Sequence, residues 1–336
     1  MKLNQQNIPG IFNDVIGPVM RGPSSSHTAA AWRAAKTSMD ILNEPLKKAI
    51  IDFDKDGAWA SNYREQGTSL GIEGGLLGLE MTDDRMKNTE LVANELGISI
   101  HYEINSFKTN HVNTFRLLLD GINGKNIQVV AISIGGGSFE IQNIDGFEVK
   151  ICGDFYEVCL FNSSKETSLE ELKSMFPQSK SIVESFSSDR RLINMKFSKE
   201  VSDKTIEKLN RIVSFDELII TKPVLPIIAG NETELPFTSV SSLLEFAEKE
   251  NLDLGALGLI YEQCQSGLED SAVINRMKKL VSIIENSIKT GLEGTTYKDR
   301  ILPQQSHLIN SAKKRNKILQ NSIINQIIAN VSAIME

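Results

Sequence analysis

The amino-acid sequence predicts an α+β protein in three parts: an α/β domain, a βαββαβ (ferredoxin-like) domain and an all-α C-terminal segment. Three observations indicate this division. Helical and strand-like patterns mix over residues 1–146, they alternate regularly over 147–223, and nearly all of 238–336 has the apolar spacing of helices. A proline-containing stretch at 224–237 is typical of a linker between the second and third parts.

The first part combines helices with strands of a substrate-binding-like α/β domain. The patterns predict a helix at 28–44, a strand at 49–61, a helix at 67–84, a strand at 98–107 and two strands within 113–137 around the turn GINGK. Gly74, Gly75 and Gly78 are expected to keep one face of the 67–84 helix slim. The second of the paired strands ends in a run of three glycines.

The second part shows strand and helix patterns joined by short polar turns. Strands are predicted at 148–162, 180–187, 190–198 and 215–222, with helices at 168–176 and 202–213. This βαββαβ order is used by small ferredoxin-like modules.

The third part is predicted to consist of helices at 239–251, 254–265, 271–291 and 316–336. The last of these carries a broad apolar face made of Ile318, Ile323, Ile324, Ile327, Ile328, Val331 and Ile334. Such a face at the end of a chain usually needs another surface to bury it.

Composition limits the classes of function. The 336 residues carry a net charge of −7, with 36 basic and 43 acidic side chains and no basic stripe, so nucleic acid is not an expected partner. The N-terminal sequence lacks the apolar core of a signal peptide, and no apolar run is long enough to cross a bilayer, so a cytoplasmic location without a membrane partner is expected.

The three cysteines, Cys152, Cys159 and Cys264, have the spacing of neither a disulfide framework nor a zinc site. They are expected to be small buried apolar residues, and no metal ligand is predicted in this chain.

The stretch GPSSSHTAAAWRAAK places Ser24, Ser25, Ser26, His27 and Thr28 at the start of a predicted helix. The first backbone N–H groups of a helix have no partner within it, and the helix dipole favours negative charge there. Hydroxyl donors and a histidine at this position suit a carboxylate or a phosphate. The alternative is that one serine caps the helix and the others lie in a loop.

Three further polar stretches are candidate parts of a binding site. The SIGGG run, Ser133 with Gly135, Gly136 and Gly137, brings backbone close to a ligand or bends a strand at a sheet edge. The EQGTS stretch contains Gln66, Gly67 and Thr68, and the HVNT stretch contains His111 and Asn113. Read singly, both are ordinary polar turns.

Taken together, these motifs resemble one family. FNDVIGPVMRGPSSSHTAAA, EQGTSLGIEGGLLG, NTFRLLL, SIGGGSFEI and DGF, in that order, are similar to motifs of the bacterial iron-sulfur-dependent L-serine dehydratases, also called L-serine ammonia-lyases. The resemblance covers the whole chain. It implies an allosteric-substrate-binding-like β-type domain at 1–146, an ACT domain at 147–223 and the helical start of an α catalytic domain at 238–336.

The resemblance implies conversion of L-serine to pyruvate and ammonia, with a [4Fe-4S] cluster as the Lewis acid. Catalytic roles are expected for His27, as acid/base or orienting group, and for Ser24, Ser25 and Ser26. Substrate contacts are expected from Thr28, Gln66, Gly67, Thr68, His111, Asn113, Ser133, Gly135, Gly136 and Gly137.

The sequence departs from the family in two places. Where many members have Gly-His-Gly-Thr-Asp, this chain has Glu65 to Ser69, and Gln66 cannot shuttle a proton. The cluster-binding cysteines of the family lie downstream of NVSAIME, where this chain ends. The cluster is therefore expected in a missing C-terminal portion or in a partner chain. The protein is expected to be a homodimer, or a heteromer with a cysteine-bearing catalytic chain, and the alternative is a non-catalytic ACT-containing sensor of amino acids.

Overall fold

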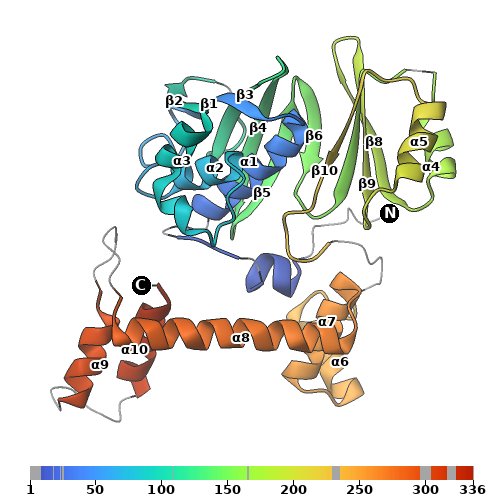
Figure 1. Ribbon diagram of the computed structural model, residues 1–336. Helices are drawn as coiled ribbons and strands as arrows, with labels where there is room; N and C mark the ends of the chain where they lie inside the picture. The colour runs from blue at the N-terminus through green and yellow to red at the C-terminus, as the bar shows by residue number, and fades with distance from the viewer. Residues whose placement is uncertain are drawn as a thin grey trace. The chain divides into compact units, whose positions relative to one another are not determined.

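The computed structural model describes residues 9–17, 19–22, 24, 26–107, 109–164, 166–228, 235–295, 304–315 and 323–335. The chain divides into two compact units: Met1–Leu235 with Cys264–Gly267, and Pro236–Gln263 with Leu268–Glu336. The first unit contains two β-sheets and their helices, and the second is helical, so the protein is α+β as predicted (Figure 1).

The first sheet has six strands in the order β2-β1-β3-β4-β5-β6. The strands are β1 (Leu46–Asp54), β2 (Ser99–Asn105), β3 (Thr114–Gly121), β4 (Asn126–Gly135), β5 (Ser138–Ile144) and β6 (Phe147–Ile151). β1 and β2 are parallel, and the other neighbours are antiparallel. The helical turns and helices of this module are η1 (Ile11–Val15), α1 (Thr28–Leu42), α2 (Thr68–Leu76), η2 (Asp84–Asn88) and α3 (Thr89–Leu96).

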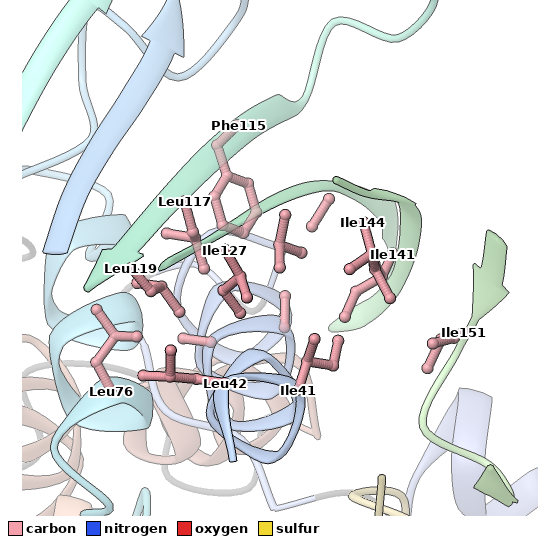
Figure 2. Packing of buried hydrophobic residues seen from close by; sticks show 14 of the residues in the cluster. Ile41, Leu42, Leu76, Phe115, Leu117, Leu119, Ile127, Ile141, Ile144 and Ile151 are labelled. Carbon is pink, nitrogen blue, oxygen red and sulfur yellow. The ribbon is translucent and has the colours of Figure 1, made fainter. Parts of the chain in front are cut away.

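The core of this module lies between α1 and the sheet. Phe115, Leu117 and Leu119 alternate with less buried residues along β3, so they share one face of the sheet. Figure 2 shows them above α1, from which Ile41 and Leu42 reach the same cluster. This amphipathic alternation is what positions α1 against the strands.

Close packing of α1 against α2 depends on glycines. A Cβ on Gly75 would lie 2.5 Å from the Trp32 carbonyl oxygen, and one on Gly74 would overlap the Met86 side chain, which agrees with the predicted slim face. Gly78 differs, because nothing lies within 4 Å of a Cβ there and its φ is +70°. It ends the helix: the N–H groups of Gly78 and Leu79 bond back to the carbonyls of Gly75 and Gly74. The prediction that the helix continues to residue 84 is therefore wrong.

The second sheet has four antiparallel strands in the order β10-β7-β9-β8. The elements are β7 (Tyr156–Phe161), α4 (Leu169–Met175), β8 (Ser179–Ser187), β9 (Arg190–Phe197), α5 (Asp203–Ile212) and β10 (Glu217–Thr221). The predicted βαββαβ order is confirmed. Both helices lie on one side of the sheet (Figure 1), where Leu172 and Leu209 join its buried cluster, and Ser168 and Ser202 cap their N-termini.

One predicted strand is wrong. Residues 148–162, expected to be one strand, form β6 and β7, which belong to different sheets. Gly153, with φ +74°, lies between them, and the turn allows the chain to leave the six-stranded sheet and start the other. Cys152 and Cys159 are consequently not on a common strand. The pattern also gave no indication of β5.

The second unit contains α6 (Val240–Glu250), α7 (Leu254–Ser266) up to Gln263, α8 (Asp270–Glu293), α9 (Ser306–Lys314) and α10 (Ile323–Met335). Ser239 and Ser242 form a capping box at α6, as the serine-rich start predicts. α10 packs on α8 and α9 yet leaves its aliphatic residues exposed: Ile323, Ile324, Ile327, Ile328 and Val331. The earlier part of the predicted last helix, 316–322, and the side chain of Ile334 lie outside the described residues.

In the described part of the chain, no helix combines the length and the apolar character needed to span a membrane.

Candidate functional site

The fold gathers the predicted polar segments at one end of the six-stranded sheet. α1 is followed by a short turn and then β1, so the N-terminus of α1 lies at the end where β1 finishes. α2 begins after the loop that leaves β1. The antiparallel register, which pairs Phe53 with Phe115 and Thr114 with Ile132, adds the start of β3 and the end of β4 to this end of the sheet.

Direct contacts join these segments. The Thr28 hydroxyl lies 3.3 Å from the Gln66 carbonyl oxygen, to which it donates. The Ala58 N–H donates to the Val112 carbonyl oxygen at 2.8 Å, which ties the loop after β1 to the turn before β3. The Ser133 N–H donates to the Asn113 carbonyl oxygen at 3.1 Å. The Ser24–Thr28 turn, the EQGTS stretch, the HVNT stretch and Ser133 are therefore parts of one site.

His27 is held in a defined orientation at this site. Ser24 Oγ and His27 Nδ1 are 2.9 Å apart and share a hydrogen bond. The carbonyl oxygen of Ser24 accepts the N–H groups of His27 and Thr28, which closes the turn into α1. The imidazole packs on Trp59, with 5.5 Å between ring centroids. Burial lowers the pKa of His27, so the imidazole is neutral at pH 7.

The hydroxyl of Ser24 is thus used to orient His27. His27 itself precedes the first residue of α1, and its side chain makes no capping hydrogen bond. Ser26 lies in the same turn, and Ser25 lies outside the described residues.

Four buried polar atoms at this end of the sheet find no hydrogen-bond partner among the described residues: His27 Nε2, Trp59 Nε1, Thr68 Oγ1 and Ser133 Oγ. Leaving a buried polar group unpaired costs about 1–3 kcal/mol. Such groups normally bind water or a ligand. They can serve a small polar molecule with both donor and acceptor groups.

Trp59 was not predicted as a site residue. It lies in a stretch with a strand-like pattern, where a large aromatic residue usually belongs to the hydrophobic core. Its side chain is 1% exposed and stacks on Phe115 at 5.2 Å between centroids. The indole N–H, with no partner among the described residues, is the feature that identifies it, and only the structure reveals that.

The glycine run forms the turn between β4 and β5. The backbone φ is positive at all three glycines, with +99° at Gly135, +58° at Gly136 and +80° at Gly137. Residues other than glycine rarely adopt these values. The carbonyl oxygen of Gly137 accepts a hydrogen bond from Arg33, so the close backbone approach seen here is to a side chain of α1. The substrate role of this run stays a prediction.

Arg33 is a second residue that the sequence did not indicate. Its guanidinium is 1% exposed and also donates to the Val19 carbonyl oxygen at 3.1 Å, so it joins α1, the glycine turn and the segment before Ser24. Burial lowers the pKa of Arg33 to about 10, which leaves it charged at pH 7.

The remaining predicted residues contact their own loops. His111 Nδ1 accepts the Asn113 N–H at 3.1 Å, and its carbonyl oxygen accepts the Thr114 hydroxyl at 2.5 Å. Asn113 lies in the turn directly before β3, where its carbonyl oxygen accepts the Ser133 N–H. Gly67, with φ +81°, allows the chain to enter α2.

The described residues do not fit an iron-sulfur cluster. None of their His, Cys, Asp and Glu side chains gather in groups of three that could hold a metal ion. Cys152 and Cys159 are buried, and burial raises the pKa of each thiol to about 12, far from the thiolate form that ligates iron. Cys264 belongs to α7.

Similar proteins are found among curated sequences. The chain is 34% identical over 152 residues to a probable L-serine dehydratase, beta chain, of Bacillus subtilis (strain 168), which covers 45% of this chain and 68% of that protein. It is 29% identical over 178 residues to an L-serine dehydratase, beta chain, of Peptoniphilus asaccharolyticus, covering 53% and 79%. No protein-family model matches the chain.

Proposed function

The chain belongs to the family of L-serine dehydratase β chains, and from this premise we propose that it binds L-serine at the Ser24–Thr28 turn for conversion to pyruvate and ammonia. The observation that carries this proposal is the set of four buried polar atoms, at the end of the sheet where this turn lies, that have no partner among the described residues. L-serine has a carboxylate, an ammonium and a hydroxyl, and these can use both donors and acceptors.

The carboxylate of L-serine is assigned to the N-termini of α1 and α2. Both helices begin at this end of the sheet, and a helix N-terminus favours an anion. The hydroxyls of Thr68 and Ser133 and the indole N–H of Trp59 are further donors. The charge of Arg33 behind the glycine turn adds to the positive potential.

His27 is proposed to exchange a proton with the substrate through Nε2. Because the imidazole is neutral, Nε2 either accepts a proton or donates one, depending on the tautomer that Ser24 stabilises at Nδ1. β-Elimination removes the α-proton and the hydroxyl as water, and the enamine then tautomerises and takes up water to give pyruvate and ammonia. Gln66 has no acid/base role in this scheme and is proposed to position the substrate.

A [4Fe-4S] cluster would supply a Lewis acid for the departing hydroxyl. Because the described cysteines do not fit such a cluster, no step is assigned to it in this chain. We propose that the cluster is held by a cysteine-bearing partner chain. The names of the relatives, as β chains, support a heteromer.

The βαββαβ module is proposed to be an ACT-like regulatory domain. Its strand order and two-helix layer support this assignment. A chain that only senses amino acids is the alternative, and the Ser24–His27 pair beside the four buried polar atoms favours the dehydratase.

The test is L-serine binding to the full chain, measured by tryptophan fluorescence and by calorimetry. We expect His27→Gln and Ser24→Ala to weaken binding at least tenfold, because each removes a polar contact of the site. The matched control is the exposed Ser99–His101 pair, whose side chains are 2.7 Å apart, through His101→Gln and Ser99→Ala. Unchanged L-serine affinity in folded His27→Gln contradicts the proposal.

The same samples, reconstituted anaerobically with iron and sulfide, are assayed for pyruvate. The chain alone is expected to bind L-serine without forming pyruvate, because its cysteines do not fit a cluster. Pyruvate together with cluster absorbance would overturn the assignment of the cluster to a partner chain.

A further inference from the structure

A cavity of about 130 Å³ lies between the two sheet modules of the first unit. Ile41, near the C-terminus of α1, forms part of it, whereas the Ser24–Thr28 turn lies at the other end of this helix. With 15 residues and 1.5 Å of rise per residue, α1 separates the two places by about 20 Å. The cavity is therefore distinct from the proposed L-serine site.

Both modules supply its walls. Polar side chains of both signs line it: Lys125, Arg190, Asp145, Asp216, Glu217 and the amide Asn162. The apolar part consists of Ile41, Ile127, Ile144, Phe161 and Ile219. Figure 2 shows the first three of these within the core cluster of the six-stranded sheet module. A lining with cations, anions and a small apolar area suits a zwitterion better than an ion of one sign.

Contacts within the wall fix these groups. Lys125 pairs with Glu217 and donates to the Ile41 carbonyl oxygen at 3.0 Å. Arg190 donates to the Asp145 carbonyl oxygen at 2.9 Å and stacks on Phe147, 4.9 Å from the ring centroid. The Lys125–Glu217 pair and the hydrogen bond from Arg190 to Asp145 join one module to the other.

The wall still has capacity for a ligand. The guanidinium of Arg190 has five N–H donors, and its hydrogen bonds to Asp145 and Ser187 are both made by one nitrogen. Asn162 donates to Asp216 Oδ2 at 2.8 Å, while its own Oδ1 is buried and has no partner among the described residues. Donors for a carboxylate and acceptors for an ammonium therefore line one cavity.

We propose that this cavity binds a small neutral amino acid as its zwitterion, with the carboxylate on Arg190 and the ammonium on Asp216 and Asn162 Oδ1. The volume of about 130 Å³ is close to that of a protein cavity of about 150 Å³ that accepts benzene, which has six heavy atoms. Alanine has six heavy atoms and serine has seven. Because the walls come from both modules, the bound amino acid connects them and stabilises their packing.

This site does not rest on the proposed function, and the experiment separates the two. Calorimetric titration of the full chain uses L-alanine and L-serine as ligands, and pyruvate and ethanolamine as fragments with one charge each. His27→Gln is the background, so that binding at the proposed L-serine site is weakened at least tenfold while the cavity is measured. Arg190→Gln and Asp216→Asn are added singly. Arg211→Gln, an exposed arginine on α5 of the same module, is the control.

In the His27→Gln background we expect one binding event for L-alanine. Arg190→Gln or Asp216→Asn should weaken it at least tenfold, because each removes a charged hydrogen-bonding partner. Arg211→Gln should have no effect, and pyruvate and ethanolamine should bind at least tenfold more weakly than L-alanine.

Unchanged L-alanine affinity in both cavity variants overturns the proposal, as does a folded His27→Gln chain that binds no amino acid. Equal binding of pyruvate and L-alanine also overturns it, because the ammonium would then contribute nothing. If L-serine leaves the tryptophan emission of the wild-type chain unchanged while the cavity still binds L-alanine, the proposed function alone is refuted.

Discussion

Gly71→Ala tests whether the packing of α2 on α1 builds the candidate site. A Cβ on Gly71 would overlap the Thr28 carbonyl oxygen and lie 2.9 Å from its carbonyl carbon. Carbon atoms prefer about 3.5 Å or more, so relief of the second contact alone separates the helices by about 0.6 Å, and relief of the overlap with the oxygen requires more. The atoms are backbone at the start of α1, where the Ser24–Thr28 turn is attached, and no side chain can rotate away.

The expected loss of unfolding free energy is about 2 kcal/mol. Overpacking of this kind costs about 3 kcal/mol at its upper range, and the helix propensity of alanine returns about 1 kcal/mol. L-serine affinity should fall as well, because the displaced α2 carries Thr68 away from His27.

Urea unfolding followed by tryptophan fluorescence measures this loss. The chain has two tryptophans, Trp32 and Trp59, and both are buried in the six-stranded sheet module, so the signal reports on that module. Gly74→Ala in the same helix is the control, since its Cβ meets the flexible side chain of Met86, which can move. A Gly71→Ala chain as stable as the wild type, or no less stable than Gly74→Ala, would refute the reasoning.

Two further predictions concern buried titratable groups. Burial raises the pKa of Glu157 to about 7 from 4.5, while Lys196 at 3.2 Å and the Asn194 amide oppose the shift. The folded chain therefore keeps a proton that the unfolded chain loses, so stability should fall as pH rises from about 4.5 to 7. Glu157→Gln should remove up to about 3 kcal/mol of this change in urea titrations at each pH, and an unaltered slope contradicts the assignment. Secondly, iodoacetamide at pH 8 should label Cys264 in the folded chain, but not Cys152 or Cys159, whose buried thiols have a pKa of about 12. Mass spectrometry counts the labels, and urea-unfolded chain, in which all three react, is the control; labelled Cys159 without urea would argue against its burial.

Local patterns predicted those elements whose signals are local. The alternation of apolar residues over β3 and the βαββαβ order are examples, because each strand and helix there has its own apolar face. The same reasoning failed at 148–162, where two strands follow each other with Cys152–Phe155 between them. Hydrophobic residues continue through the break. Which sheet each half joins depends on tertiary contacts, and periodicity in the sequence does not encode these.

Some residues of the candidate site could be predicted from the sequence and others could not. Ser24, His27 and Thr28 lie within five consecutive residues, so their unusual density of polar groups was visible as a motif. Arg33 and Trp59 lie within apolar helical and strand-like patterns, and only their tertiary contacts distinguish them from core residues.

The cavity between the two sheet modules could not be predicted from the sequence. Its charged residues come from separate turns and strands of both modules, and none of them belongs to a motif. Asp145 illustrates the difficulty, because the Asp-Gly pair that it forms with Gly146 is what a tight hairpin turn requires, and both residues have positive φ. From the sequence, the Asp145–Gly146 pair indicates only a tight turn. The Asp145–Gly146 turn nevertheless lies against the β8–β9 hairpin, where Arg190 bonds to its carbonyl oxygen. A residue selected for one local geometry thus becomes part of a site that exists only after two modules have packed, and such sites have to be found from structure.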